Sequence, residues 1–335
     1  MKSKTTNSLL LVKSASCSKY LSQAKASFAL LSLFAFGCVA SGQSLKTTGI
    51  ISMAPFPSGK LLLLDQKGRL QKINTAVDDS VLETVTGNFA EGNARHIAAY
   101  VNQQEFLLAV TPREIEWFLP NGGAAGHRPI PLPFTGEVGG IAVDSFNRRA
   151  YLSEMTAGTV WAIALDRGTS TRLASTRVFE KLVSMAVDSA RQIVFVADAI
   201  QAKVYFIRIN ELGGPRFWSL ADGDKSYRTL SAPYGLAYNE RRQEIYVADE
   251  GRGAIYSLNA SSDQALKGAG LEWGMFRGRA NPYLKKTSWE VPSVIAFDHK
   301  GRLWVFDRRS NQLFSIDPSV TKQEMLIQRQ LPVSK

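Results

Sequence analysis

One pattern of hydrophobic and polar positions recurs along the chain. Residues 235–249, G-L-A-Y-N-E-R-R-Q-E-I-Y-V-A-D, contain two short apolar runs that are separated by a polar turn and closed by an acid. The same pattern is found at 139–154, 183–198 and 293–307, with weaker copies at 51–65 and 95–110. Short runs of this kind, rich in β-branched and aromatic residues and bounded by turn residues, predict pairs of β-strands.

Two positions in the pattern fix its spacing. The shared alanine occurs at Ala54, Ala98, Ala142, Ala186, Ala237 and Ala296, first every 44 residues and then at intervals of 51 and 59. The closing acid is present in five of the six copies, as Asp65, Glu154, Asp198, Asp249 and Asp307, and Val110 replaces it in the second. Because two landmarks give nearly the same period, the chain contains a true internal repeat.

Each repeat has room for four strands. A third apolar run follows each acid, at 70–73, 115–118, 160–163, 204–207, 255–258 and 313–316, and a fourth strand fits the connecting segments, for example 82–86 or 176–180. Four antiparallel strands every 40–50 residues or so are typical of a propeller blade. The sequence therefore predicts an all-β protein, a six-bladed β-propeller of four-stranded antiparallel blades that spans residues 43–335.

The recurrence of the acid favours a structural role over a catalytic one. A single active site would use such a residue once, whereas this acid returns in five repeats. A short acidic side chain accepts backbone N–H bonds in turns. We therefore predict that Asp249 and its equivalents cap the turn that leads to the next strand.

The N-terminus is typical of a secretory signal. Residues 1–42 carry five lysines and no acid, then an apolar run at 27–37 and small residues around the expected cleavage point. This predicts a signal peptide over 1–42 and an exported protein, periplasmic or extracellular. Both cysteines, Cys17 and Cys38, lie in this segment, so no disulfide is expected in the propeller. Cys38 leaves two alternatives open, a lipid anchor or a residue discarded with the signal.

The net charge of the chain says little about the class of partner that it binds. The chain of 335 residues has a formal charge of +11, which falls to +6 without the signal lysines. A modest excess that is spread along the chain does not predict nucleic-acid binding, for which basic residues cluster. No transmembrane span is predicted, since the apolar run is shorter than the ~20 residues that a span needs, and a monomer is expected.

The repeat resembles the NHL and YWTD repeats and the blades of gluconolactonase and regucalcin, all six-bladed TolB-like propellers; the resemblance covers residues 49 to about 318. It implies one divalent metal in the lactonase-like enzymes, held by Glu, Asn and Asp at the start of the innermost strands. The matching positions here, three residues before each shared alanine, are Ile51, Arg95, Gly139, Val183, Tyr234 and Ser293. None is a carboxylate, and Tyr234 replaces the asparagine in P-Y-G-L. No metal, cofactor or catalytic residue is therefore predicted; the alternative is a lactonase-like hydrolase with one divalent cation, Ca²⁺ or similar.

Two places are candidates for binding. Arg95, His96, Tyr234 and Ser293 are predicted at the channel mouth, where a cationic and aromatic set suits an anionic or sugar-like ligand; the alternative is plain lining, with His96 hydrogen-bonded between blades. The long segment 259–292 could bind a protein partner through interleaved basic and aromatic residues, namely Trp273, Arg277, Arg279, Tyr283, Lys285, Lys286 and Trp289. Alternatively, Trp273 or Trp289 packs inward. The sequence thus favours an exported binding or scaffolding protein.

Overall fold

The computed structural model describes residues 49–77, 81–85, 89–210, 216–219, 230–266, 274–277, 289–318 and 327–330. The chain divides into two units, Met1–Ser41 and Gly42–Lys335, and every described residue belongs to the second. The predicted signal peptide, with Cys17 and Cys38, lies outside the described residues.

The described residues form six four-stranded antiparallel sheets, in each of which the strands pair in chain order. The first sheet consists of β1 (Ile50–Pro55), β2 (Lys60–Asp65), β3 (Leu70–Asn74) and β4 (Glu83–Thr84). The second consists of β5 (His96–Asn102), β6 (Gln104–Val110), β7 (Glu114–Phe118) and β8 (Ile130–Pro131). The third consists of β9 (Val138–Asp144), β10 (Arg149–Glu154), β11 (Thr159–Ala164) and β12 (Ser170–Ser175).

The last three sheets repeat the same order. The fourth consists of β13 (Leu182–Asp188), β14 (Ile193–Asp198), β15 (Lys203–Arg208) and β16 (Arg216–Ser219). The fifth consists of β17 (Pro233–Asn239), β18 (Glu244–Asp249), β19 (Ala254–Asn259) and β20 (Gly274–Arg277). The sixth consists of β21 (Pro292–Phe297), β22 (Leu303–Asp307), β23 (Gln312–Ile316) and β24 (Ile327–Gln330). The described helices are short, namely η1 (Phe89–Gly92), η2 (Glu250–Arg252) and α1 (Asp263–Leu266), and none of them could span a bilayer.

These sheets confirm the all-β prediction and the third strand of each repeat. One predicted strand, 176–180, is wrong. The fourth strand of that sheet is β12 (Ser170–Ser175), which pairs with β11 directly after a tight turn at Gly168. Of the β12 side chains only Leu173 is buried. Because this strand is half exposed and polar, it lacks the apolar run on which the prediction depended.

The sheets pack against one another on both faces, which explains the uninterrupted apolar runs. In the run Leu61–Leu64, all four side chains are fully buried. Leu61 and Leu63 join a cluster with Trp304 of the sixth sheet, whereas Leu62 and Leu64 join a cluster that includes Leu107 of the second. Alternate side chains point to opposite faces of a strand, so a strand buried on both faces must be apolar throughout.

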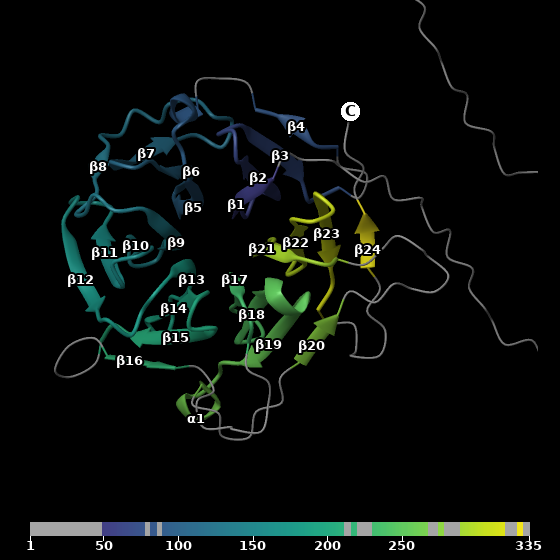
Figure 1. Cartoon of the computed structure of the whole chain (residues 1–335). Helices are drawn as coiled ribbons and strands as arrows, with labels where there is room; N and C mark the ends of the chain where they lie inside the picture. The colour runs from purple at the N-terminus through teal and green to yellow at the C-terminus, as the bar shows by residue number, and fades with distance from the viewer. Residues whose placement is uncertain are drawn as a thin grey trace, which may run out of the picture. The chain divides into compact units, whose positions relative to one another are not determined.

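The first strand of each sheet, here called the inner strand, contacts the inner strand of the next. These contacts run from β1 to β5, β9, β13, β17 and β21, and β21 also contacts β1 (Figure 1). The approach is close enough to require glycine in two places. A Cβ on Gly139 would clash with the Leu182 carbonyl, and one on Gly235 with the Ser293 carbonyl.

Candidate ligand site

The six positions that the sequence places at the start of the inner strands share a structural feature. In five sheets the residue falls at a bulge, where the register between the first and second strands shifts, namely Ile51, Gly139, Val183, Tyr234 and Ser293. Arg95 differs, because it precedes the first pair of its ladder, His96 with Val110. A bulge re-aims the side chain that it carries. These positions lie at what we call the connection end of the sheets, where the turns between second and third strands and the links between sheets are found.

The repeated acids fix the chain at this end. The fully buried carboxylate of Asp249 accepts bonds from the Ser231 and Ala232 N–H groups at 2.8 and 2.9 Å, just before Tyr234. Asp198 accepts bonds from the N–H groups of Glu180 and Lys181 in the same way, at 2.7 and 3.1 Å. Asp198 and Asp249, and likewise Asp307, therefore hold the link that enters their sheets.

The predicted turn cap is correct for some acids and not for Asp249. Asp65 accepts bonds from Lys67 and Arg69 N–H in the following turn, as predicted. After Asp249 the chain forms η2, whose Gly253 N–H bonds the Glu250 carbonyl, and Asp249 makes no side-chain cap. Because the backbone closes that turn by itself, the Asp249 carboxylate reaches back to the incoming link.

Tyr234 lies in a charged group that we call the Tyr234 cluster, made of Lys181, Tyr234, Glu250 and Arg308. The Lys181 ammonium lies 5.9 Å from the centroid of the Tyr234 ring and the Arg308 guanidinium 5.6 Å from it. Both distances suit cation–π attraction. Tyr234 lies at the bulge of β17, and the other three residues come from a link, from η2 and from a turn at the connection end, so the cluster joins the fourth, fifth and sixth sheets.

Glu250 is the most unusual member of the cluster. Its side chain is only 6% exposed, and its Oε2 lies 2.6 Å from an Arg308 nitrogen. Its Oε1 has no hydrogen-bond partner among the described residues. Burial raises the pKa of this carboxyl to about 7; Arg308 opposes the rise, and Asp249 and Asp307 add to it.

The other predicted ligand residues do not join Tyr234. His96 Nε2 lies 3.0 Å from the Val138 carbonyl of the third sheet, and burial lowers the pKa of its imidazole, so its ring bridges two sheets as the alternative foresaw. Ser293 is buried and donates to the Phe306 carbonyl of its own sheet at 3.3 Å. Arg95 is exposed, but β5 and β17 lie three steps apart in the succession of inner strands.

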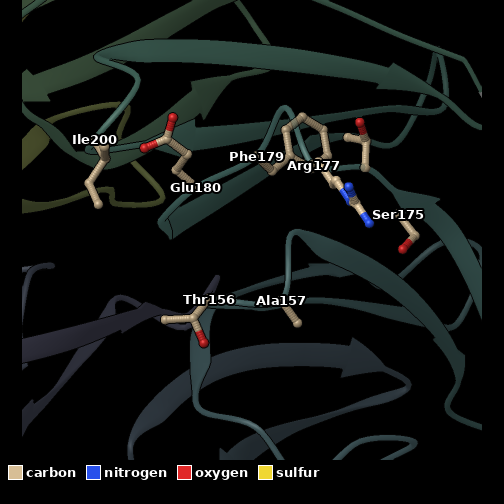
Figure 2. Close-up of a pocket in the computed structure, with 8 residues that line it drawn as sticks. Thr156, Ala157, Ser175, Arg177, Phe179, Glu180 and Ile200 are labelled. Carbon is tan, nitrogen blue, oxygen red and sulfur yellow. The ribbon is translucent and has the colours of Figure 1, made fainter.

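A pocket of about 540 Å³ opens between the third and fourth sheets, at the same connection end. In Figure 2, Thr156 and Ala157 of the β10–β11 turn lie across the gap from Arg177 and Glu180 of the β12–β13 link. The remaining lining residues are Ser175, Thr176, Phe179 and Ile200. Glu180 is followed directly by Lys181 in the chain. The link that lines the pocket therefore continues directly into the Tyr234 cluster.

The proposed partner-binding segment is described only in part. Trp273, Arg279, Tyr283, Lys285 and Lys286 lie outside the described residues, and Arg277 ends β20. Trp289 is 2% exposed and packs edge-on against Phe314 at 6.1 Å, so it packs inward.

In the part of the chain that the structure describes, no group of three or more His, Cys, Asp or Glu side chains could hold a metal ion. The fully buried aspartates Asp198 and Asp249 are already bonded to backbone N–H groups.

No protein-family model matches the sequence, and no curated protein matches it. Several solved structures do match the chain. A chain of the nidogen/laminin complex aligns over 80% of this chain and 92% of its own length, with a TM-score of 0.57 and 15% identity. An auxiliary nutrient binding protein from Bacteroides ovatus ATCC 8483 aligns over 82% of this chain and 71% of its own, with a TM-score of 0.59 and 13% identity. The chain has the β-propeller fold.

Solved structures with quite different descriptions resemble this β-propeller. A streptogramin B lyase structure matches at a TM-score of 0.54 and 12% identity, over 84% of this chain and 83% of its own. At such identities the shared feature is the fold alone, because one fold carries many functions.

The sequence pointed to Tyr234 and missed its three partners. Glu250 and Arg308 each follow directly after a repeated acid, Asp249 and Asp307, so a comparison of the post-acid positions between repeats could have singled them out. Lys181 lies in a link of variable length, for which the repeat offers no landmark.

Proposed function

We propose that residues 43–335 form a closed six-bladed β-propeller that acts outside the cytoplasm as a monomeric binding protein. The ligand is a small acidic molecule rich in hydroxyl groups, such as a sugar acid. The contact between β21 and β1 supports closure of the ring, and the signal-like N-terminus supports export.

The single observation that carries the proposal is the pair of cations over Tyr234. Lys181 and Arg308 approach the same half-buried ring from different sheets, at 5.9 and 5.6 Å from its centroid. Arg308 is still 52% exposed, although it is paired with Glu250. Two cations that lie near one aromatic ring offer a preformed site for a carboxylate, whose bonds to charged donors are about twice as strong as neutral ones.

The adjoining pocket suits the uncharged part of such a ligand. Thr156, Ser175 and Thr176 supply hydroxyls, and Arg177 and Glu180 supply a donor and an acceptor. Sugar hydroxyl groups both donate and accept, so a mixed polar lining of this kind can fix their orientation. The volume of about 540 Å³ lies within the range of small-molecule sites.

Calorimetric titration with three probes tests this proposal. D-glucuronate carries both the carboxylate and the hydroxyl groups, D-glucose only the hydroxyl groups and acetate only the carboxylate. We expect D-glucuronate to bind more tightly than either. The substitutions Lys181→Met and Arg308→Met should each weaken binding about 10- to 100-fold, the range for a lost charge-assisted bond.

Arg167→Met is the matched control, because Arg167 is 78% exposed at the opposite end of the third sheet. It should leave the affinity unchanged. Equal losses in all three variants would contradict the proposed site, since they would reveal a non-specific charge effect.

The alternative function, a metal-dependent hydrolase, makes a different prediction. Calcium, magnesium, zinc or manganese added in turn should leave the melting temperature unchanged, and a lactone substrate should not be hydrolysed. A metal that clearly raises the melting temperature would favour the hydrolase, because a ligand that binds only the folded state stabilises it.

A further inference from the structure

The cluster holds a carboxylate that competes with the proposed ligand. Glu250 Oε2 pairs with Arg308 at 2.6 Å, so the guanidinium that would bind an incoming carboxylate already faces one. The two partners differ in exposure, since Arg308 is 52% exposed and Glu250 only 6%. The cation is therefore open to a ligand while its present partner is buried beneath it.

The surroundings of Glu250 carry charges of both signs. Arg308 and Lys181 favour the ionised carboxylate, and Asp249 and Asp307 oppose it. Arg252, in the same 3-10 helix, lies 4.0 Å from Asp249. Asp249 and Asp307 are fully buried and accept backbone N–H bonds, so their side chains are held in place near Glu250.

Burial decides the protonation equilibrium of Glu250. Glu250 Oε1 has no hydrogen-bond partner among the described residues, so half of this buried carboxylate is left uncompensated. Burial accordingly raises the pKa of Glu250 from an ordinary value of 4.5 to about 7. Glu250 thus exchanges its proton with solvent near neutral pH, where most carboxyl groups are fully ionised.

We propose that Glu250 couples ligand capture to proton uptake, so that the site takes acidic ligands together with one proton. The inference rests on the proposed function. When a carboxylate binds Lys181 and Arg308, a second negative charge stands beside Glu250, and repulsion favours the protonated carboxyl. A proton from solvent binds the Glu250 carboxylate and neutralises it. The ion pair between Glu250 and Arg308 is then lost, and Arg308, still positively charged, bonds to the ligand instead.

The affinity for acidic ligands is therefore expected to depend on pH in one direction. Below the pKa of free Glu250 the group is already protonated, and the affinity is constant. Between this pKa and the raised pKa of Glu250 in the liganded protein, binding takes up a fraction of a proton, and the affinity falls by at most tenfold per pH unit. Above both pKa values the affinity is constant again. A ligand-induced rise of about one unit in this pKa predicts a roughly fivefold loss of affinity between pH 6 and pH 8.

Titrations of D-glucuronate between about pH 6 and pH 8 test the coupling, because its carboxylate stays ionised throughout. Repeating them in buffers of different ionisation enthalpy gives the number of protons taken up. For the wild-type chain we expect an uptake of about 0.4 proton at pH 8, and of less than about 0.1 proton at pH 6. Glu250→Gln should keep the pH 6 affinity at both pH values and take up none.

Glu290→Gln is the matched control, since Glu290 is 56% exposed and pairs with Arg309 at 2.7 Å. It should keep the wild-type pH dependence. Glu250→Gln should also be at least as stable as the wild type at pH 8. A raised pKa means that the ionised carboxylate destabilises the folded state as the pH rises from 4.5 through about 7.

The possible outcomes separate the two proposals. Binding that is strong but independent of pH, or a pH dependence that survives in Glu250→Gln, overturns the proton coupling and leaves the binding function intact. No binding at pH 6, where the site is most receptive, overturns both.

Discussion

Replacing Asp249 by alanine is expected to lower the free energy of unfolding by about 2–6 kcal/mol. The carboxylate is fully buried and accepts the Ser231 and Ala232 N–H groups at 2.8 and 2.9 Å. Alanine leaves both donors without their partner, at about 1–3 kcal/mol each. The link before Tyr234 would also lose its anchor, so binding of D-glucuronate should weaken as well.

Urea unfolding followed by tryptophan fluorescence measures this loss. Asp249→Asn keeps a side-chain acceptor and should lose less than the alanine variant. Asp166→Ala, at an exposed aspartate paired only with neighbouring Arg167, is the control and should change stability by less than about 0.5 kcal/mol. An Asp249→Ala protein as stable as that control would show that the repeated acid does not hold the incoming link.

The second large effect is expected where the last sheet meets the first. Phe306 is fully buried in a cluster that contains Leu61 and Leu63 of the first sheet and Trp304 and Leu313 of the sixth. Phe306→Ala should cost about 3–5 kcal/mol, because it removes a large side chain and leaves a cavity. Phe306→Leu should cost less, since it fills part of that volume.

Equilibrium unfolding of these variants tests whether the ring closes as proposed. The control is Phe146→Ala, because Phe146 is 87% exposed and its loss leaves no cavity. A loss below about 1 kcal/mol for Phe306→Ala would mean that the first and sixth sheets do not pack tightly, contrary to a closed propeller.

The sequence was most informative where burial acts on both faces of a strand. The run Leu61–Leu64 is apolar throughout because it touches two neighbouring sheets, and such runs repeat in every unit. The outer strands were harder to predict from the sequence. β12 buries only Leu173 and reads as a polar loop, which is why the predicted strand at 176–180 was misplaced.

Site residues could be predicted from the sequence only where they occupy a position that recurs in every repeat. Tyr234 was found because it stands three residues before the shared alanine Ala237, a position at which the structure has a bulge in five sheets. Its partners Lys181 and Arg308 come from other sheets, and nothing in the local pattern says which links meet in space. His96 and Ser293 share the labelled region, yet their side chains bond backbone carbonyls of the sheets, a difference that composition cannot reveal.

The most direct test of the account is a crystal structure of the chain with D-glucuronate bound at about pH 6. We expect the ligand carboxylate within hydrogen-bond distance of both Lys181 and Arg308, with the sugar ring directed toward Thr156 and Glu180. Glu250 should then have lost its contact with Arg308. Ligand bound elsewhere, for instance at Arg95, with the Glu250–Arg308 pair intact, would contradict the Tyr234 cluster as the binding site.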